Sequence, residues 1–181
     1  MKIFYTTKYL KTEESKKYFL NKAINIYLGF QEEKNLRLKI EKTSNGKPYI
    51  QGFPEFSISH KNNYLAIAIS NMPIGVDIET EKEVKENIIK KFFSQNDYEN
   101  YKNNKISGIE LWCKKEALIK TYGGTVFDKI GYLGENDSDN RSCVMLSGIK
   151  YYMQRIKPYK NIIGSISFTS KDEIIEEIYF E

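Results

Sequence analysis

The stretch Gly75-Val76-Asp77-Ile78-Glu79 alternates apolar and acidic residues, and it decides how the rest of the sequence is interpreted. Because side chains along a strand point to opposite faces in turn, Val76 and Ile78 face one side and Asp77 and Glu79 the other. Two like charges on one face of a partly buried strand repel each other, and a set of oxygen ligands suits Mg²⁺. The pair suggests a cation such as Mg²⁺, while a solvated acidic strand edge is the commoner explanation of such pairs taken alone.

Further along the chain, the segment Leu111–Tyr122 has the spacing of an amphipathic helix with Lys115 inside its apolar stripe. An ammonium there must reach solvent or find a partner, since an unpaired charge in a core costs several kcal/mol. Glu116 and Lys120 are spaced i and i+4 along the border of the stripe. Both can face the cleft that holds the two strand carboxylates, and a surface salt bridge is the alternative.

Two other positions carry groups that suit phosphate. His60 is the only histidine and ends the strand-like run Phe56–His60; a lone histidine is usually structural, but its ring can donate a hydrogen bond to a phosphate. Gly46-Lys47-Pro48 is a turn that presents an ammonium, and by itself it indicates only a β-turn. No serine elbow, Walker loop or GxGxxG motif is present, so a Ser-His-Asp hydrolase and the common nucleotide-binding loops are not supported.

Periodicity along the chain predicts an α+β protein in which a helix followed by strands occurs twice. The first helix is expected over Glu14–Gly29, with Gly29 ending it, and two more over Lys85–Tyr101 and Ile109–Tyr122. Strands are expected, in chain order, over Leu36–Glu41, Pro48–Gln51, Phe56–His60, Tyr64–Ser70, Ile74–Glu79, Ser142–Lys150, Tyr151–Ile156, Ile162–Thr169 and Ile174–Phe180.

This order suggests two similar lobes related by a pseudo-twofold axis, residues 1–80 and 81–181. Each lobe is expected to pack a helix on a small antiparallel sheet, with the active site between the lobes. The polar stretch Gly134–Asn140 is typical of a solvated surface loop.

Composition narrows the class of protein. The 181 residues are 14% aromatic, enough for a packed core, and the net charge of +4 falls short of a dedicated nucleic-acid binder. No apolar leader or membrane-spanning run is present, so we expect a cytoplasmic protein without a membrane or nucleic-acid partner. Cys113 and Cys143 form neither a metal-ligand pattern nor a disulfide framework, and we interpret both as free thiols.

Taken together, five motifs in order closely resemble the Sfp-type 4′-phosphopantetheinyl transferase family. They are Gly46-Lys47-Pro48, Phe56-x-Ile58-Ser59-His60, Gly75-Val76-Asp77-Ile78-Glu79, Phe92-Phe93-Ser94 and Trp112-x-x-Lys115-Glu116-Ala117-x-x-Lys120. The resemblance runs from about Glu14 to Tyr122, and its specificity lies in the last carboxylate motifs combined. It implies transfer of the phosphopantetheine arm of coenzyme A to a carrier-protein serine; the alternative is an inactive homologue that binds coenzyme A or another nucleotide.

The resemblance also implies a role for each motif residue. Asp77, Glu79 and Glu116 would surround one Mg²⁺ that also holds the coenzyme A pyrophosphate. Glu116 would accept the serine proton, directly or through a water, while His60 and Lys120 would stabilise charge on the phosphoryl oxygens. The residues implied to bind coenzyme A are Lys17, Lys47, Pro48, Ser59, His60, Lys115 and Lys120.

The sequence departs from the family pattern in two places. Lys17 takes the position of a family arginine in the first helix, and since lysine offers no bidentate fork, we expect a looser contact with the 3′-phosphate. Gly123-Gly124-Thr125 replaces the more usual Gly-x-Gly after the motif helix, which changes the loop beyond it. The implied partner is an acidic, helical acyl or peptidyl carrier protein docked near the segment after Glu79, with this chain acting as a monomer.

Overall fold

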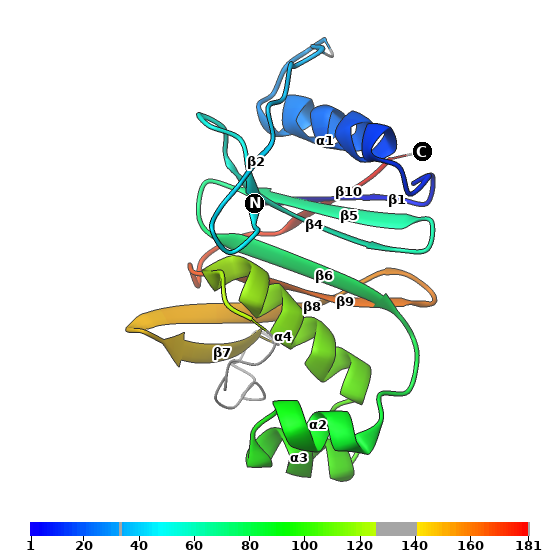
Figure 1. The fold of residues 1–181 in the computed structure, drawn as a ribbon, viewed down its shortest axis with the longest axis vertical. Coiled ribbons are helices and arrows are strands. Elements are labelled where there is room, and N and C mark those ends of the chain that lie inside the picture. The colour runs from blue at the N-terminus through cyan, green and yellow to red at the C-terminus, as the bar shows by residue number, and fades with distance from the viewer. Residues whose placement is uncertain (33, 126–140, 181) are drawn as a thin grey trace.

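The computed structural model describes residues 1–32, 34–125 and 141–180, which form two four-stranded sheets, a short two-stranded sheet and four helices (Figure 1). The helices are α1 (Glu13–Tyr27), α2 (Glu86–Phe92), α3 (Gln95–Lys102) and α4 (Gly108–Tyr122). The strands are β1 (Lys2–Thr6), β2 (Glu41–Lys42), β3 (Pro48–Tyr49), β4 (Glu55–Lys61), β5 (Tyr64–Ser70), β6 (Ile74–Thr80), β7 (Arg141–Leu146), β8 (Ile149–Tyr159), β9 (Ile162–Phe168) and β10 (Glu176–Tyr179).

Strand pairing mixes the two ends of the chain. The first sheet has the order β10-β1-β5-β4 and the second β6-β9-β8-β7. All neighbours within these sheets are antiparallel except β1 and β10, which run parallel. The α+β class with small, largely antiparallel sheets is thereby confirmed.

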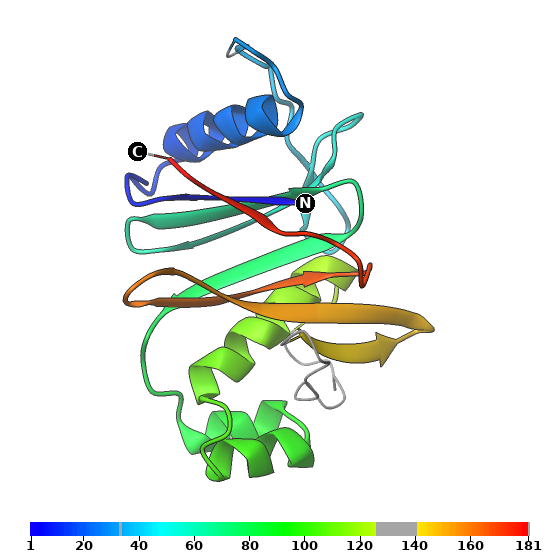
Figure 2. The ribbon, with the colours of Figure 1, turned by 180° about the vertical axis from the view of Figure 1, so that it is seen from behind.

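The two large sheets lie side by side with their edge strands β4 and β6 adjacent, and α1 covers one face of the first sheet while α4 covers one face of the second (Figures 1 and 2). Val76 and Ile78 of β6 pack with Ile3 and Tyr5 of β1 in one core between the sheets. A second core, which includes Phe19, lies between α1 and the first sheet. Helix α4 packs against β6 and β9 on the opposite face of the second sheet. The acidic face of β6 is therefore turned toward α4.

Local sequence signals explain where α1 and α4 begin and end. The Thr12 side chain accepts a hydrogen bond from the N–H of Ser15 at the start of α1, and Gly29 follows its end with φ of 73°. Ser107 caps α4 in the same way, and Gly123 ends it in the left-handed conformation, φ 83°. The expected helices over Glu14–Gly29 and Ile109–Tyr122 are confirmed.

The expected strand over Leu36–Glu41 is wrong for all but its last residue. The structure begins β2 only at Glu41, because side chains of α1 bind the backbone of the preceding segment. The N–H of Leu36 donates to Asn21 Oδ1 at 2.9 Å, and Asn25 Nδ2 donates to the carbonyl of residue 34 at 3.0 Å. These bonds replace the ladder that a strand would need.

The expected helix over Lys85–Tyr101 is two helices. Phe93 is extended, with φ −121° and ψ 167°, and Ser94 then caps α3 by accepting a hydrogen bond from the N–H of Asp97. Serine favours caps over helix interiors because its hydroxyl competes for nearby backbone groups. The apolar periodicity of the sequence continues across Phe93 and Ser94, so it did not predict the break between the two helices.

Two strand predictions also change. The sequence did not predict β1, and the expected strand over Ser142–Lys150 ends at Leu146. Ser147 and Gly148, with φ of 51° and 79°, form a two-residue turn, and β8 begins at the next residue. The predicted loop at Gly134–Asn140 lies outside the described residues.

The division at residues 80 and 81 stays a prediction, and strand pairing crosses it twice. Strand β6 precedes the division but pairs with β9, and β10 follows it but pairs with β1. Among the helices of the described residues, none is both long enough and apolar enough to cross a membrane.

Candidate active site

Strand β6 places its two carboxylates on the face that α4 covers. Asp77 is opposite Ser165 of β9 and is 7% exposed, while Glu79 is opposite Ile163 and only partly buried. Val76 and Ile78 point into the core between the sheets. The alternation read from the sequence is confirmed, and the acidic face is a helix-covered face rather than a solvated edge.

Helix α4 comes unusually close to β6 because Gly75 has no side chain. A Cβ at Gly75 would lie 2.0 Å from the carbonyl oxygen of Ala117 and 2.5 Å from Thr121 Oγ1. The last two turns of α4 therefore lie directly over the acidic strand, and they carry Glu116 and Lys120 into its vicinity.

Asp77 and Lys120 form an ion pair at the centre of the site. Lys120 Nζ lies 2.8 Å from Asp77 Oδ1 and donates to the carbonyl of Val76 at 3.0 Å. The hydroxyl of Ser59 donates to the same Oδ1 at 2.9 Å. Three residues that the sequence singled out thus meet at one carboxylate oxygen.

Glu79 is held by two lysines that the sequence did not single out. Its Oε2 lies 2.6 Å from Lys61 Nζ and 3.2 Å from Lys82 Nζ. Burial acts to raise the pKa of Glu79, but the hydrogen bonds from both lysines outweigh it and leave the pKa below its usual value. The carboxylate is therefore ionised and already paired.

Glu116 is under electrostatic pressure from its neighbours. Burial raises the pKa of this carboxyl, the negative charges of Asp77 and Glu79 raise it further, and Lys120 opposes the shift. Within residues 1–32, 34–125 and 141–180, however, no group of three His, Cys, Asp or Glu side chains is close enough to hold a metal ion. The three carboxylates feel one another's charge, but the expected metal cluster is not assembled.

The donor set nevertheless fits Mg²⁺ chemically. Asp77, Glu79 and Glu116 offer only oxygen, the ligand type this ion prefers, and few protein ligands suffice because water and phosphate complete its shell. Burial, and then the like charges of Asp77 and Glu79, raise the pKa of Glu116, and a bound cation would stabilise its charged form. No expected ligand is replaced by an apolar side chain.

A cavity of about 210 Å³ beside this site joins two of the expected phosphate ligands. Its lining consists of Asn45, Gly46, Lys47, Pro48, Ser57, Ile58, Ile119, Lys120, Gly123 and Gly124. Asn45 Nδ2 donates to the carbonyl of Gly123 at 2.5 Å and so ties the turn before β3 to the end of α4. Lys47 reaches the cavity from that turn and forms an ion pair of 2.8 Å with Glu55.

His60 lies in a basic environment at the exposed end of β4. Its ring is tilted against that of Tyr9, with 5.1 Å between centroids. Burial lowers the pKa of the imidazole, and the positive charges of Lys16 and Lys120 lower it further. A neutral ring at neutral pH can still donate a hydrogen bond to an anion.

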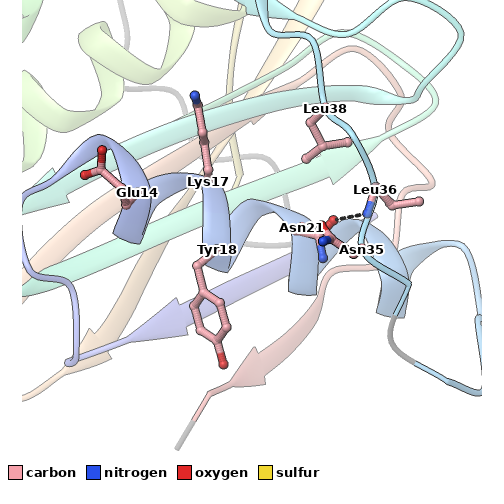
Figure 3. Close-up of a pocket in the computed structure, with 7 residues that line it drawn as sticks. All are labelled: Glu14, Lys17, Tyr18, Asn21, Asn35, Leu36 and Leu38. Carbon is pink, nitrogen blue, oxygen red and sulfur yellow. Dashed lines mark hydrogen bonds between the residues drawn. The ribbon is translucent and has the colours of Figure 1, made fainter.

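The first helix splits its lysines between two places. Lys16 acts electrostatically on His60 and pairs with Glu13 at 2.6 Å. Lys17, the residue chosen from the resemblance, lines a separate cavity of about 620 Å³ between α1 and the segment before β2 (Figure 3). That cavity is lined by Glu14, Lys17, Tyr18, Asn21, Asn35, Leu36 and Leu38.

Lys115 is bound to the end of α2. It is 2% exposed, and its Nζ donates to the carbonyl of Phe92 at 2.5 Å and lies 5.3 Å from the ring centroid of Phe93. The carbonyl belongs to the last residue of α2, where the helix dipole favours a cation. The buried ammonium thus has a helix end and an aromatic ring as partners, in place of reaching solvent.

Four residues of the site, Ser57, Lys61, Lys82 and Asn45, were not predicted from the sequence. Ser57 lies two residues before Ser59 and so shares its strand face, which would have marked it as a neighbour. Lys82 follows Glu79 by three residues, whereas Lys61 belongs to β4 and meets Glu79 only in the folded structure. Asn45 belongs to an Asn-Gly turn, and nothing in that turn indicates a contact with Gly123.

Comparison with known proteins agrees with this site. Residues 73–148, which include β6 and α4, match the family model of the 4′-phosphopantetheinyl transferase superfamily. The class expected from the five motifs is thereby supported by an independent match to the segment that holds Asp77, Glu79, Glu116 and Lys120.

Individual relatives point the same way. The chain is 36% identical over 94 residues to the 4′-phosphopantetheinyl transferase gsp of Aneurinibacillus migulanus, covering 49% of this chain and 40% of that protein. It is 33% identical over 121 residues to a 4′-phosphopantetheinyl transferase of Bacillus subtilis, covering 63% and 48%. It is 36% identical over 85 residues to the 4′-phosphopantetheinyl transferase Sfp of Bacillus subtilis strain 168, covering 43% and 38%. The resemblance to Sfp-type transferases is confirmed, and the matched segments span less than half the length of these relatives.

Proposed function

We propose that this chain transfers the 4′-phosphopantetheine group of coenzyme A to a serine hydroxyl of an apo acyl or peptidyl carrier protein. The observation that carries the proposal is the meeting of Asp77, Glu116 and Lys120 where α4 crosses β6, inside the segment that matches the superfamily. Carboxylates and a lysine beside a cavity with a second lysine suit the handling of a pyrophosphate.

In the proposed reaction the serine oxygen attacks the β-phosphorus of coenzyme A. A bond forms between the serine oxygen and phosphorus, the bond to the bridging oxygen breaks, and 3′,5′-ADP leaves with that oxygen. Glu116 takes the serine proton, directly or through a water. The same carboxylate is proposed as a metal ligand as well.

Charge on the phosphoryl oxygens is the main cost of this transfer. Lys120 and Lys47 line one cavity and are proposed to hold the phosphates, with Pro48 shaping the turn between them. His60 adds a hydrogen-bond donor at the basic end of β4. Each such contact is expected to lower the barrier by about 3 kcal/mol.

We propose Mg²⁺ as the metal, held by Asp77, Glu79 and Glu116. When bound, the ion would neutralise negative charge on the pyrophosphate. Because Glu79 is paired with Lys61 and Lys82, these lysines would turn from the carboxylate to the phosphates or to solvent when the site fills.

The carrier is proposed to dock beside the segment after Glu79. A cavity of about 440 Å³ there is lined by Glu79, Lys82, Glu83, Val84, Lys85, Ile88, Ile109 and Trp112. Two lysines and two glutamates surround an apolar floor, which suits a carrier helix with apolar side chains whose acidic groups lie beside Lys82 and Lys85. The net charge of +4 would also favour the encounter.

We further propose two similar lobes related by a pseudo-twofold axis, acting as one monomer. The helix on one face of each large sheet supports this arrangement, with α1 on the first and α4 on the second. The 210 Å³ cavity draws its lining from the turn before β3, from β4 and from the end of α4, as a site between lobes should.

The test is intact-mass spectrometry of apo carrier proteins incubated with this chain, coenzyme A and Mg²⁺. We expect a mass gain equal to phosphopantetheine, lost with Glu116→Ala and with a chelator. Circular dichroism and coenzyme A binding show that the variant is folded. No gain across several carriers, with coenzyme A still bound by the wild type, would favour an inactive homologue and overturn the proposal.

A further inference from the structure

The two large sheets meet edge to edge at β4 and β6, and serine side chains make the junction. Both strands are outermost in their sheets. The N–H of Val76 donates to Ser57 Oγ at 3.0 Å, and the N–H of Ile78 donates to Ser59 Oγ at 3.1 Å. Two hydroxyls spaced i and i+2 on β4 thus serve two amides with the same spacing on β6.

Both serines are needed because their amide partners are buried. Ser57 and Ser59 are 4% and 6% exposed, and Val76 and Ile78 lie in the core between the sheets. A buried N–H without an acceptor costs about 1–3 kcal/mol. The hydroxyls therefore take the place of a strand that would otherwise pair with this edge of β6.

The two serines differ in what their hydroxyl protons do. Ser59 donates to Asp77 Oδ1 at 2.9 Å, the oxygen that also accepts from Lys120 Nζ at 2.8 Å. Ser57 Oγ accepts from the N–H of Val76, and among the described residues it has no hydrogen bond with a carboxylate. Ser59 is thus fixed by the backbone next to Asp77 and in turn fixes the Asp77 side chain.

We propose that Ser59 is a positioning residue, which holds the Asp77 carboxylate for Mg²⁺ rather than contacting coenzyme A. This inference rests on the proposed function for the identity of the ion. The resemblance assigns Ser59 to coenzyme A binding, but the structure turns its hydroxyl into the junction, where both its donor and an acceptor lone pair are used by β6. Loss of a partner that orients a metal ligand typically weakens metal affinity about 10- to 100-fold.

Ser57→Ala is the matched control, because it removes the same kind of junction bond without touching Asp77. Mg²⁺ alone is titrated into wild type, Ser59→Ala, Ser57→Ala and Ser59→Thr by calorimetry. The free energy of unfolding of each is measured in urea without Mg²⁺. We expect Ser59→Ala to raise the Kd for Mg²⁺ about 10-fold or more, Ser57→Ala to leave it unchanged, and Ser59→Thr, which keeps the hydroxyl, to stay near wild type. Both alanine variants should lose unfolding free energy, and Ser59→Ala should lose more because it also gives up the bond to Asp77.

Several outcomes would overturn the inference. Equal losses of Mg²⁺ affinity in both alanine variants would make Ser59 a junction residue only. A higher KM for coenzyme A with unchanged Mg²⁺ affinity in Ser59→Ala would return it to coenzyme A binding, and absence of Mg²⁺ binding by wild type would remove the ion altogether. If Ser59→Ala does not fold, Ser59→Cys replaces it, because a thiol is a weak donor and must also raise the Kd. Mg²⁺ binding is read without a carrier, so a chain that binds Mg²⁺ as expected yet transfers nothing would sink the proposed function alone.

Discussion

Replacing Gly75 with alanine should disrupt the fold and the site together, because α4 packs against the bare backbone at this position. The new Cβ would lie 2.0 Å from the Ala117 carbonyl oxygen, 2.5 Å from Thr121 Oγ1 and 2.8 Å from the Thr121 N. Two of these three atoms are backbone, so no side-chain rotation can move them aside. Helix α4 would have to retreat by about 1.5 Å to restore ordinary contact distances.

The size of the effect follows from overpacking. Forcing extra atoms into a well-packed core costs about 1–3 kcal/mol and occasionally more, and a clash with backbone belongs at the upper end. The hydrogen bonds from Thr121 Oγ1 to the carbonyls of Ala117 and Ser167 would be strained as well. We therefore expect Gly75→Ala to lower the free energy of unfolding by about 3 kcal/mol. Since a misplacement of about 1 Å already costs about 100-fold in rate, this retreat of α4 should lower kcat about 100-fold or more in the molecules that remain folded.

Gly148→Ala is the matched control, since a Cβ there meets no atom within 4 Å and only the backbone angle, φ 79°, opposes it. That strain is worth about 1–2 kcal/mol. Urea unfolding measures both variants, and single-turnover transfer to a carrier measures activity. A loss in Gly75→Ala no larger than in Gly148→Ala, or unchanged kcat, would refute the close packing of α4 on β6 as the reason for a glycine.

Three further substitutions test individual charges and hydrogen bonds of the site. Because the pKa of Glu116 is raised, its protonated form stabilises the fold below pH 4.5, and this stability is lost as pH rises through the folded pKa. The free energy of unfolding of Glu116→Gln, measured in urea without Mg²⁺, should therefore equal that of wild type at pH 4 and exceed it at pH 7. The same difference at both pH values would contradict the shift. Lys47→Ala should raise KM for coenzyme A about 10-fold, the effect of losing a charged hydrogen bond. Glu55→Ala breaks the same ion pair but should leave KM unchanged. Equal effects of the two changes would show that Lys47 acts only through its ion pair. Asn45→Ala removes the hydrogen bond to the Gly123 carbonyl, which should lower the free energy of unfolding by about 1 kcal/mol and raise KM for coenzyme A. An unchanged KM would show that this hydrogen bond does not support coenzyme A binding in the cavity.

Strand and helix identities were largely readable from local pattern. The alternation in β6 and the spacing in α4 give each element's type and faces, because side-chain period depends only on backbone geometry. In the structure Ser107 and Gly123 cap the two ends of α4. The failures came where neighbours distant in sequence took over the backbone hydrogen bonds, as Asn21 does for Leu36.

Pairing partners were not readable in this way. Alternation in β6 shows that Val76 and Ile78 face a core, but it does not say which sheet supplies that core. The structure gives β6 to β9 and leaves its other edge to the serines of β4. Strand β1 likewise depends on β5 and β10, from the middle and the far end of the chain.

The sequence by itself determined the chemical inventory of this protein: the carboxylates Asp77, Glu79 and Glu116, the lysines around them, and the elements that carry them. Only the tertiary structure decided which groups meet. Lys120 bonds to Asp77 across 43 residues, Lys115 donates to the end of α2, and Ser59 donates to the Asp77 carboxylate. The reason is physical, since periodicity reports the geometry of one element, whereas contacts between elements are set by how their buried faces pack.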